Sequence, residues 1–531
     1  MAITQINRNG VYELTDEATA SLESSKYFNK DIRPTVKSER TWGTYNISML
    51  WVGMSICIPS FMMASGLVGM GLSVWASVFN VVLGNVLILI PIQLNSYVGT
   101  KYGISFPVFS RLTFGMKGAH IASISRAITA CGWCAVQCGL GGTAVMFCVQ
   151  AFVPSLDINT TACVWVGFLI FLLMTWLLTA FGEKIIRIFE AIGSPVLIVM
   201  SVGLLIWAFV IAGNAGYSIG DVFSTNITSG DTNATRGGAI AVFLIGLTNN
   251  IGFWATMALN IPDFSRYAKN QKAQFRGQLY GMPVMMAICA VIGAVYAQAT
   301  FLADITGNQV ALFSPVDALA YIGTPGTVSH SILLLVLGIG VIIATLTTNI
   351  AANVVAPGNG FSNLSPKRIS YFWGVTIACV IAIVYQFLLT SSDTLSNAMF
   401  TFLNIYGGIL APFAAILIID YWVHKKQRVE VIDLYKEGGD TRYYYQGGFN
   451  SAAIIAWIAG AFVPTLYSII ATAAPGSAFV TNTVLYYINI NSYLFAFIVA
   501  FVVYLLIGKG KGTEKSVLSQ SELDAISRAE A

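Results

Sequence analysis

The chain has 531 residues, of which 56% are hydrophobic and only 10% are charged, and its mean hydropathy is +0.72. Soluble domains carry about 25% charged residues, so this composition excludes an ordinary soluble protein, and the small formal net charge of +4 does not suggest a nucleic-acid partner. Apolar runs of about 20 residues recur along the chain, each long enough to cross a lipid bilayer as a helix. The sequence therefore predicts an all-α polytopic membrane protein.

The first 41 residues contain no apolar core, which argues against a cleaved signal peptide. After them the apolar runs predict twelve membrane-spanning helices. These spans cover residues 43–66, 74–99, 122–150, 162–181, 187–212, 238–262, 278–302, 329–356, 370–390, 395–422, 450–472 and 482–507.

The positive charges test this count, because Lys and Arg concentrate in cytoplasmic loops. With the N-terminus in the cytoplasm, 27 of the 28 Lys and Arg residues fall on the cytoplasmic side, and only Arg236 does not. The expected organisation is a cytoplasmic segment 1–41, a single membrane domain 42–508 and a cytoplasmic tail 509–531. Residues 101–121 are too polar to span and are expected to lie along the inner surface.

Two spans contain residues that interrupt helices. Span one carries Gly53 and Pro59 in "WVGMSICIPSF", and span six carries a cluster of Asn and Gly in "IGLTNNIGFWATMALNIPDF", ended by Pro262. Backbone inside a membrane leaves the helix only where it lines a cavity. The two spans match in position if residues 43–212 and 238–422 are inverted repeats of five helices each, with 450–507 as two extra helices. Such pairs mark the central site of a transporter; the alternative is ordinary kinks.

Ionisable side chains are nearly absent from the span centres. Glu190, Asp263, Asp393 and Asp420 all lie near predicted span ends, so a relay of buried carboxylates is hard to build. The expected ligand is neutral or weakly charged and is held by aromatic faces and amides.

Span three offers such groups in "ACGWCAVQCGL", residues 130–140. Trp133 and Gln137 are four residues apart and share a helix face, so a planar heterocycle could stack on one and bond to the other. The alternative is that both only pack against neighbours. Three cysteines in the same stretch are too few for a tetrahedral metal site, and the other five are scattered; they are interpreted as packing residues. No cofactor is expected.

Span eight concentrates polar residues in "ATLTTNIAANVVAP". Thr347 and Thr348 could offer hydroxyl oxygens to a small cation, together with carbonyls from the unwound part of span one, and Asn353 could meet a substrate amide. The alternative is that the threonines bond back to their own helix and the asparagines bridge helices.

With these motifs the chain resembles the nucleobase:cation symporter 1 family, which includes hydantoin, allantoin, uracil and cytosine permeases. The resemblance covers about residues 38–445 and rests on "ERTWGTYNISMLWVGM", "GTKYGISFPVFSR", "LNIPDFSRYAKNQ", "ATLTTNIAANVVAP" and "TFLNIYGGILAPFAAILIIDYWV". It implies a LeuT-like, APC-type fold of twelve helices with a five-plus-five inverted repeat, two extra C-terminal helices and alternating access.

The resemblance also implies roles for individual residues. Trp133 and Trp254 are the expected aromatic walls, with Gln137 and Asn353 as amides that bind the substrate. The expected sodium ligands are the carbonyls of Gly53, Ile56 and Ala344 and the hydroxyls of Thr347 and Thr348. At one further substrate-facing position, where relatives carry an amide, this chain has Cys57, a weak donor and acceptor.

The function expected from this resemblance is import of a neutral planar heterocycle by symport with a cation, with uracil first, allantoin or hydantoin next, and Na⁺ as the coupling ion. The alternative is a proton-coupled permease for allantoin, cytosine or another purine-pathway compound. An ion channel would need a repeated polar lining, which no span offers. An enzyme would need a catalytic set, but the three histidines lie apart near predicted span ends. A monomer in the plasma membrane is expected.

Overall fold

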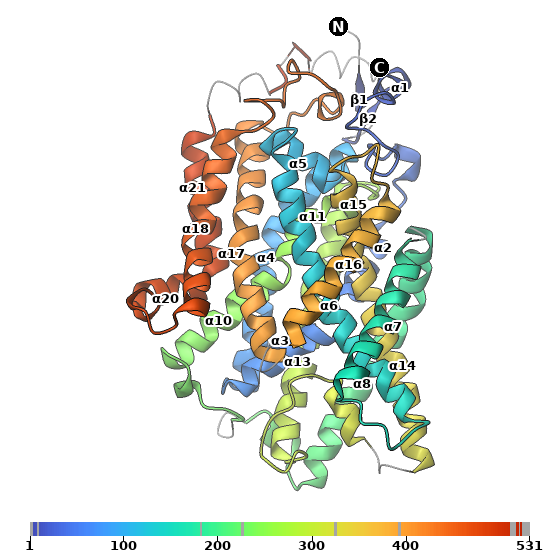
Figure 1. Ribbon diagram of the computed structural model, residues 1–531, viewed down its shortest axis with the longest axis vertical. Coiled ribbons are helices and arrows are strands. Elements are labelled where there is room, and N and C mark those ends of the chain that lie inside the picture. Colours follow the sequence, from blue (N-terminus) through green and yellow to red (C-terminus); the bar gives the residue numbers. More distant parts are fainter. Residues whose placement is uncertain are drawn as a thin grey trace.

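Figure 1 shows a computed structural model of the chain, a long bundle of helices. The structure describes residues 4–7, 10–180, 183–224, 228–322, 327–390, 395–509, 517–519 and 521–522; within these ranges the side chains of residues 183–197, 395–398, 400 and 472 are outside the description. Glu190 and Asp393, predicted near span ends, therefore lie outside the described side chains.

The elements follow each other along the chain with short connections. Strands β1 (Gln5–Asn7) and β2 (Tyr12–Leu14) pair antiparallel. The helices of the first half are α1 (Asp16–Leu22), η1 (Lys37–Glu39), α2 (Thr44–Ser55), α3 (Ile58–Gly69), α4 (Val74–Tyr102), α5 (Phe106–Phe114), α6 (Ala119–Gln150), α7 (Thr161–Ala180), α8 (Glu183–Asn214), α9 (Ile219–Val222) and η2 (Thr232–Ala234).

The second half contains the remaining helices. Its helices are α10 (Gly238–Phe253), α11 (Ala255–Asn260), α12 (Pro262–Ser265), α13 (Gln271–Leu302), η3 (Asp317–Tyr321), α14 (Val328–Thr348), η4 (Asn349–Val354), α15 (Val355–Ser362), α16 (Tyr371–Thr390), α17 (Leu395–Ile419), η5 (Asp420–His424), η6 (Ile432–Leu434), α18 (Ser451–Ala473), α19 (Ala478–Thr481), α20 (Thr483–Ile490) and α21 (Ser492–Ile507). Here η4 and η5 are π-helices, and η1, η2, η3 and η6 are 3-10 helices.

Helices long and apolar enough to cross a membrane make up most of the described chain. Nine pass that test within the described residues, or eleven if each of two bent pairs counts as one span. In α8, at predicted span five, the described apolar part is Ile198–Asn214. The polytopic helical architecture is confirmed, while the count of twelve stays a prediction.

The last predicted span, residues 482–507, is not a continuous helix. It breaks at Asn491, where α20 and α21 meet at 90°. Polar residues surround the bend, and the Ser492 hydroxyl donates to the Asn404 carbonyl of α17 at 2.9 Å. The apolar run therefore includes a separate short helix before α21.

Span one breaks where the sequence predicts. Helices α2 and α3 meet at 54°, and Ile56 and Cys57 between them leave the helical conformation. The Cys57 N–H bonds to the Ser55 carbonyl instead of reaching back four residues to Gly53. Since Pro59 stands in the first turn of α3, where its missing N–H costs nothing, the chain restarts a helix at once. The break leaves the Gly53 carbonyl without its helical partner.

Spans six and eight are also irregular. Helix α10 ends at Phe253, Trp254 stands between helices with φ −101° and ψ 9°, and Pro262 opens α12. In span eight α14 passes into the π-helix η4, which the sequence analysis did not predict. π-helical turns are frequent at functional sites because they redirect side chains.

Helix α5 lies at the end of the bundle where β1, β2 and α1 are found (Figure 1). The segment around it was expected along the inner surface, yet every residue of α5 is buried. Arg111 donates hydrogen bonds to the carbonyls of Tyr27 and Leu434 and to Asn363 Oδ1, and burial lowers its pKa to about 10. The N-terminal segment and the loop after η5 therefore cover α5, and its place at the inner surface stays a prediction.

Candidate functional site

The indole of Trp133 on α6 is held by aromatic neighbours. Its ring packs edge-on against Phe253 at 5.2 Å and against Phe402 at 5.9 Å between centroids. Its Nε1 donates to the Tyr406 hydroxyl at 2.9 Å, and this hydroxyl donates in turn to the Gly252 carbonyl at 2.8 Å. With its N–H occupied, Trp133 has its π face to offer a ligand.

Trp254, at the break of span six, is fixed in a similar way. Its Nε1 donates to Asn85 Oδ1 of α4 at 2.8 Å. Its ring lies edge-on to Trp51 at 5.1 Å and to Phe253 at 4.9 Å. Phe253 thus touches both tryptophans, and the predicted aromatic walls belong to one continuous cluster with their polar atoms bonded elsewhere.

Gln137, one turn along α6 from Trp133, carries an unused acceptor. Its side chain is 2% exposed, and Oε1 has no hydrogen-bond partner among the described residues. A buried carbonyl without a donor costs about 1–3 kcal/mol, so a ligand N–H at this atom would recover that cost. The Cys57 thiol lies close enough to interact with both Gln137 and Thr348, and it also contacts the Ser60 hydroxyl at 3.2 Å.

Oxygen atoms from spans one and eight converge at Thr348. Its hydroxyl lies 3.0 Å from the Gly53 carbonyl, which the break in span one has released, and 3.4 Å from the Ala344 carbonyl. All three residues are buried. Small cations in transporters of broken-helix type are held by unwound backbone carbonyls and helix ends, and this oxygen set fits such an ion.

Two other predicted sodium ligands are placed less directly. Thr347 bonds back to its own helix, at 2.8 Å from the Ala344 carbonyl and 3.2 Å from that of Ile343, as the alternative interpretation of span eight anticipated. Ile56 lies at the break itself, and the Ser60 N–H bonds to the Cys57 carbonyl rather than to that of Ile56. Among the described residues, neither Ile56 nor Thr347 forms a hydrogen bond with Thr348.

Asn353 reaches the site through a neighbour. Its Nδ2 donates to Asn349 Oδ1 at 3.1 Å, one turn earlier on η4. Asn349 Nδ2 donates in turn to Cys138 on α6 and Thr175 on α7, both at 3.3 Å. The amide predicted to bind substrate is therefore attached through Asn349 to the helix that carries Gln137. In the described part of the chain, no hydrogen bond joins Asn353 directly to Gln137 or Trp254.

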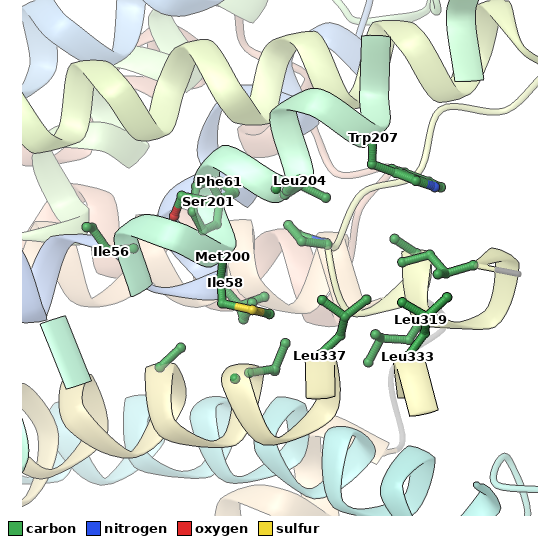
Figure 2. Close-up of a pocket in the computed structure, with 17 residues that line it drawn as sticks. Ile56, Ile58, Phe61, Met200, Ser201, Leu204, Trp207, Leu319, Leu333 and Leu337 are labelled. Carbon is green, nitrogen blue, oxygen red and sulfur yellow. The ribbon is translucent and has the colours of Figure 1, made fainter. Parts of the chain in front are cut away.

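An apolar cavity of about 360 Å³ lies beside the oxygen cluster (Figure 2). Ile56 and Ala344 line it, and the other lining side chains come mainly from α3, α8, α14 and η3, with Met200, Leu204, Trp207 and Leu337 prominent. None of the predicted substrate residues lines this cavity. It is a neighbour of the candidate site and not the site itself.

Asn85, Tyr406 and Asn349 were not predicted as site residues, although each forms a hydrogen bond with a candidate residue. Asn85 is one of four amides in span two, with Asn80, Gln93 and Asn95, so the sequence alone did not single it out. Tyr406 lies inside one of the motifs that carry the family resemblance. The cysteines pack in hydrophobic clusters as expected, and no group of three metal-ligating side chains occurs among the described residues.

Comparison with known proteins decides the family. A family model described as permeases for cytosine/purines, uracil, thiamine and allantoin matches residues 34–494. The chain belongs to the nucleobase:cation symporter 1 family. It is 35% identical to the purine-uracil permease of Arabidopsis thaliana, over 93% of this chain and 80% of that protein. It is 32% identical to the allantoin permease of Bacillus subtilis, over 83% and 87%.

A solved structure of this family shares the fold. The transporter Mhp1, in a closed conformation with bromovinylhydantoin bound, superposes with a TM-score of 0.72 at 21% identity, covering 94% of this chain and 99% of that one. The predicted LeuT-like fold class is thereby confirmed. As a member of the nucleobase:cation symporter 1 family, the chain is a multi-pass membrane transporter and not an enzyme.

Proposed function

We propose that this chain imports a neutral planar heterocycle, uracil first and allantoin or hydantoin next, together with Na⁺. The observation that carries the proposal is the buried, unpartnered Gln137 Oε1, placed one helical turn from Trp133 and beside Cys57. A flat ring stacked on Trp133 would bring an N–H to this oxygen. The names of the relatives, a purine-uracil and an allantoin permease, are consistent with such rings.

Uracil is a small ring, and this agrees with the presence of Cys57 where relatives carry an amide. A thiol is a weak hydrogen-bonding group, so the substrate would rely on Gln137, Asn353 and the aromatic walls. A compact ring needs fewer polar contacts than a longer ureide such as allantoin. This preference supports uracil over allantoin as the first candidate.

Sodium is favoured over a proton by the chemistry around Thr348. The proposed ion site holds backbone carbonyls and hydroxyls, with Gly53, Ala344 and Thr348 in contact and Ile56 and Thr347 as further ligands. These oxygens can bind a metal ion, whereas proton coupling calls for a titratable group. The described carboxylates Asp263 and Asp420 lie instead at span ends.

Cys57 is the proposed link between the two ligands, because it stands in the break of span one with its thiol near both Gln137 and Thr348. The cation would bind first and order the break in span one, after which the heterocycle completes the site and favours closure. Such coupling is reciprocal, so each ligand must raise the affinity of the other by the same factor.

The arrangement in the membrane is also part of the proposal. Residues 1–41 and 509–531 face the cytoplasm, residues 42–508 form one transport domain in the plasma membrane, and 43–212 and 238–422 are its two inverted repeats. The transporter works as a monomer.

Uptake of labelled uracil by cells expressing the chain tests the proposal, with and without sodium and with excess allantoin, hydantoin or cytosine as competitors. Sodium-stimulated uptake that uracil-like rings inhibit most strongly is the expected result. Uptake that depends on a pH gradient and not on sodium would reject Na⁺ as the coupling ion. Uptake of allantoin alone would reject uracil and leave the site assignment in place.

A further inference from the structure

The paired cysteines of span three surround one amide. Asn349 Nδ2 lies 3.3 Å from Cys138 Sγ, 3.7 Å from Cys134 Sγ and 3.3 Å from Thr175 Oγ1. All four side chains are 0% exposed. Two thiols on α6 and a hydroxyl on α7 therefore form a polar cradle for the nitrogen of an amide on η4.

In this cradle the nitrogen side of the Asn349 amide faces the two thiols and the hydroxyl. A carboxamide donates through its nitrogen and accepts through its oxygen. With the nitrogen in the cradle, Oδ1 is directed to Asn353, whose Nδ2 donates to it at 3.1 Å. If the Asn349 amide turned over, its nitrogen would face the Asn353 nitrogen, and that hydrogen bond would be lost.

The orientation of Asn349 decides what Asn353 offers a ligand. One of the two N–H groups of Asn353 Nδ2 is used by Asn349, and no described residue donates to Asn353 Oδ1, which is therefore an acceptor without a partner. Gln137 Oε1 is likewise an acceptor without a donor. Both candidate substrate amides thus present carbonyl oxygens.

We propose, on the basis of the proposed function, that Cys134, Cys138 and Thr175 position Asn349 so that Asn353 acts as a hydrogen-bond acceptor. Asn349 is then a positioning residue that sets substrate class. The transporter selects rings with N–H donors along their edge, such as imides and cyclic ureides. It disfavours rings that are N-methylated there and rings with an unprotonated nitrogen at that place, such as cytosine.

Cys131 provides a matched control on the same helix. It is 0% exposed like Cys134 and Cys138, yet it makes no bond to Asn349 and packs in a different cluster, with Ala127, Phe361 and Ala378. If the thiols act only as small apolar residues, Cys131→Ala and the double variant Cys134→Ala/Cys138→Ala should have similar effects. If they orient Asn349, only the double variant should change selectivity.

The test is competition for transport in cells that express each variant at equal surface level. Inhibition constants are measured for uracil against 3-methyluracil and for hydantoin against 3-methylhydantoin. The variants are Asn349→Ala, Cys134→Ala/Cys138→Ala, Cys134→Ser/Cys138→Ser and Cys131→Ala. Comparing each ring with its methylated form separates selectivity from a general loss of activity.

Wild type should reject the methylated rings by about tenfold or more, as expected when a buried acceptor loses its donor. Asn349→Ala and the double alanine variant should lose most of that discrimination. The double serine variant, which keeps two acceptors, should retain it, as should Cys131→Ala. If Asn349→Ala does not reach the surface, the cysteine variants decide alone.

Three results would overturn the proposal. One is unchanged discrimination in the double alanine variant, and another is an equal loss in Cys131→Ala. The third is a wild type that binds none of the four rings, and this alone would also reject the proposed function. If Gln137→Ala loses transport while the cradle variants keep normal selectivity, the positioning role of the cradle is rejected and the proposed transport function stands.

Discussion

The Tyr406 hydroxyl accepts a 2.9 Å hydrogen bond from Trp133 Nε1 and donates a 2.8 Å bond to the Gly252 carbonyl. One buried side chain of span ten thus joins the proposed stacking wall to the backbone just before the break in span six. The ring of Phe402 packs against Tyr406 at 4.8 Å and steadies it.

Replacing this hydroxyl should weaken substrate binding without removing the wall. In Tyr406→Phe the Trp133 N–H and the Gly252 carbonyl both lose a partner, a cost of about 1–3 kcal/mol per group, and the indole is freer to turn. We expect a higher KM for the substrate and a changed tryptophan fluorescence. Tyr385→Phe is the control, because the Tyr385 ring packs on Phe402 while its hydroxyl bonds to none of the described residues. An equal effect in this variant would contradict the role of Tyr406.

Removing the Gln137 amide should reduce affinity for the heterocycle. In Gln137→Ala a substrate N–H loses its buried acceptor, so binding should weaken by about 1–3 kcal/mol. Direct binding of labelled substrate to purified protein measures this change. Gln150→Ala, on the last turn of the same helix, is the control. It should bind substrate like wild type, because the Gln150 amide donates to the Leu156 carbonyl at 2.8 Å. Unaltered binding in Gln137→Ala for every candidate ring would place the pocket elsewhere.

Thr348→Ala should abolish stimulation by sodium, because it removes the hydroxyl that meets the Gly53 and Ala344 carbonyls. Thr348→Ser, which keeps the oxygen, should restore it. Thr345 is the matched control on the same helix, since its hydroxyl bonds only to the Val341 carbonyl at 2.8 Å. The measurement is the sodium dependence of uptake, and a Thr348→Ala variant with normal sodium stimulation would remove Thr348 from the ion site.

The end of span ten holds a buried ion pair whose disruption should destabilise the protein. Lys425 Nζ lies 2.6 Å from Asp420 Oδ2, and both side chains are 0% exposed. Asp420→Asn leaves the buried ammonium without its counter-charge, so the free energy of unfolding should fall by about 3–5 kcal/mol. Thermal unfolding in detergent checks this. The double change Asp420→Asn/Lys425→Met should recover most of the loss, and a single variant as stable as wild type would contradict the expectation.

Much of the fold was predictable because the bilayer imposes simple rules. Apolar length and the distribution of Lys and Arg predicted a polytopic bundle, and Gly53, Pro59 and Pro262 predicted where spans one and six are irregular. These signals are local, since each depends on a few neighbouring residues.

What the sequence could not predict depends on contacts between distant segments. The π-helix η4 contains no glycine or proline that would have predicted it. It points Asn349 toward thiols that lie more than 200 residues earlier in the sequence. Asp420 lies near a span end as predicted, yet its burial with Lys425 follows from packing against α21, where it also meets Tyr504. The cover over α5 comes from the N-terminal segment and the loop after η5, which meet it only in the folded chain.

The most direct test of the central claim is the reciprocity of binding to purified protein. We would titrate uracil by calorimetry in saturating sodium and in a sodium-free choline buffer, and titrate sodium with and without uracil. If Cys57 and the broken span one join the two sites, sodium should raise uracil affinity severalfold, and uracil should raise sodium affinity by the same factor. Uracil binding that is equally tight in both buffers would contradict the claim that one site couples the two ligands.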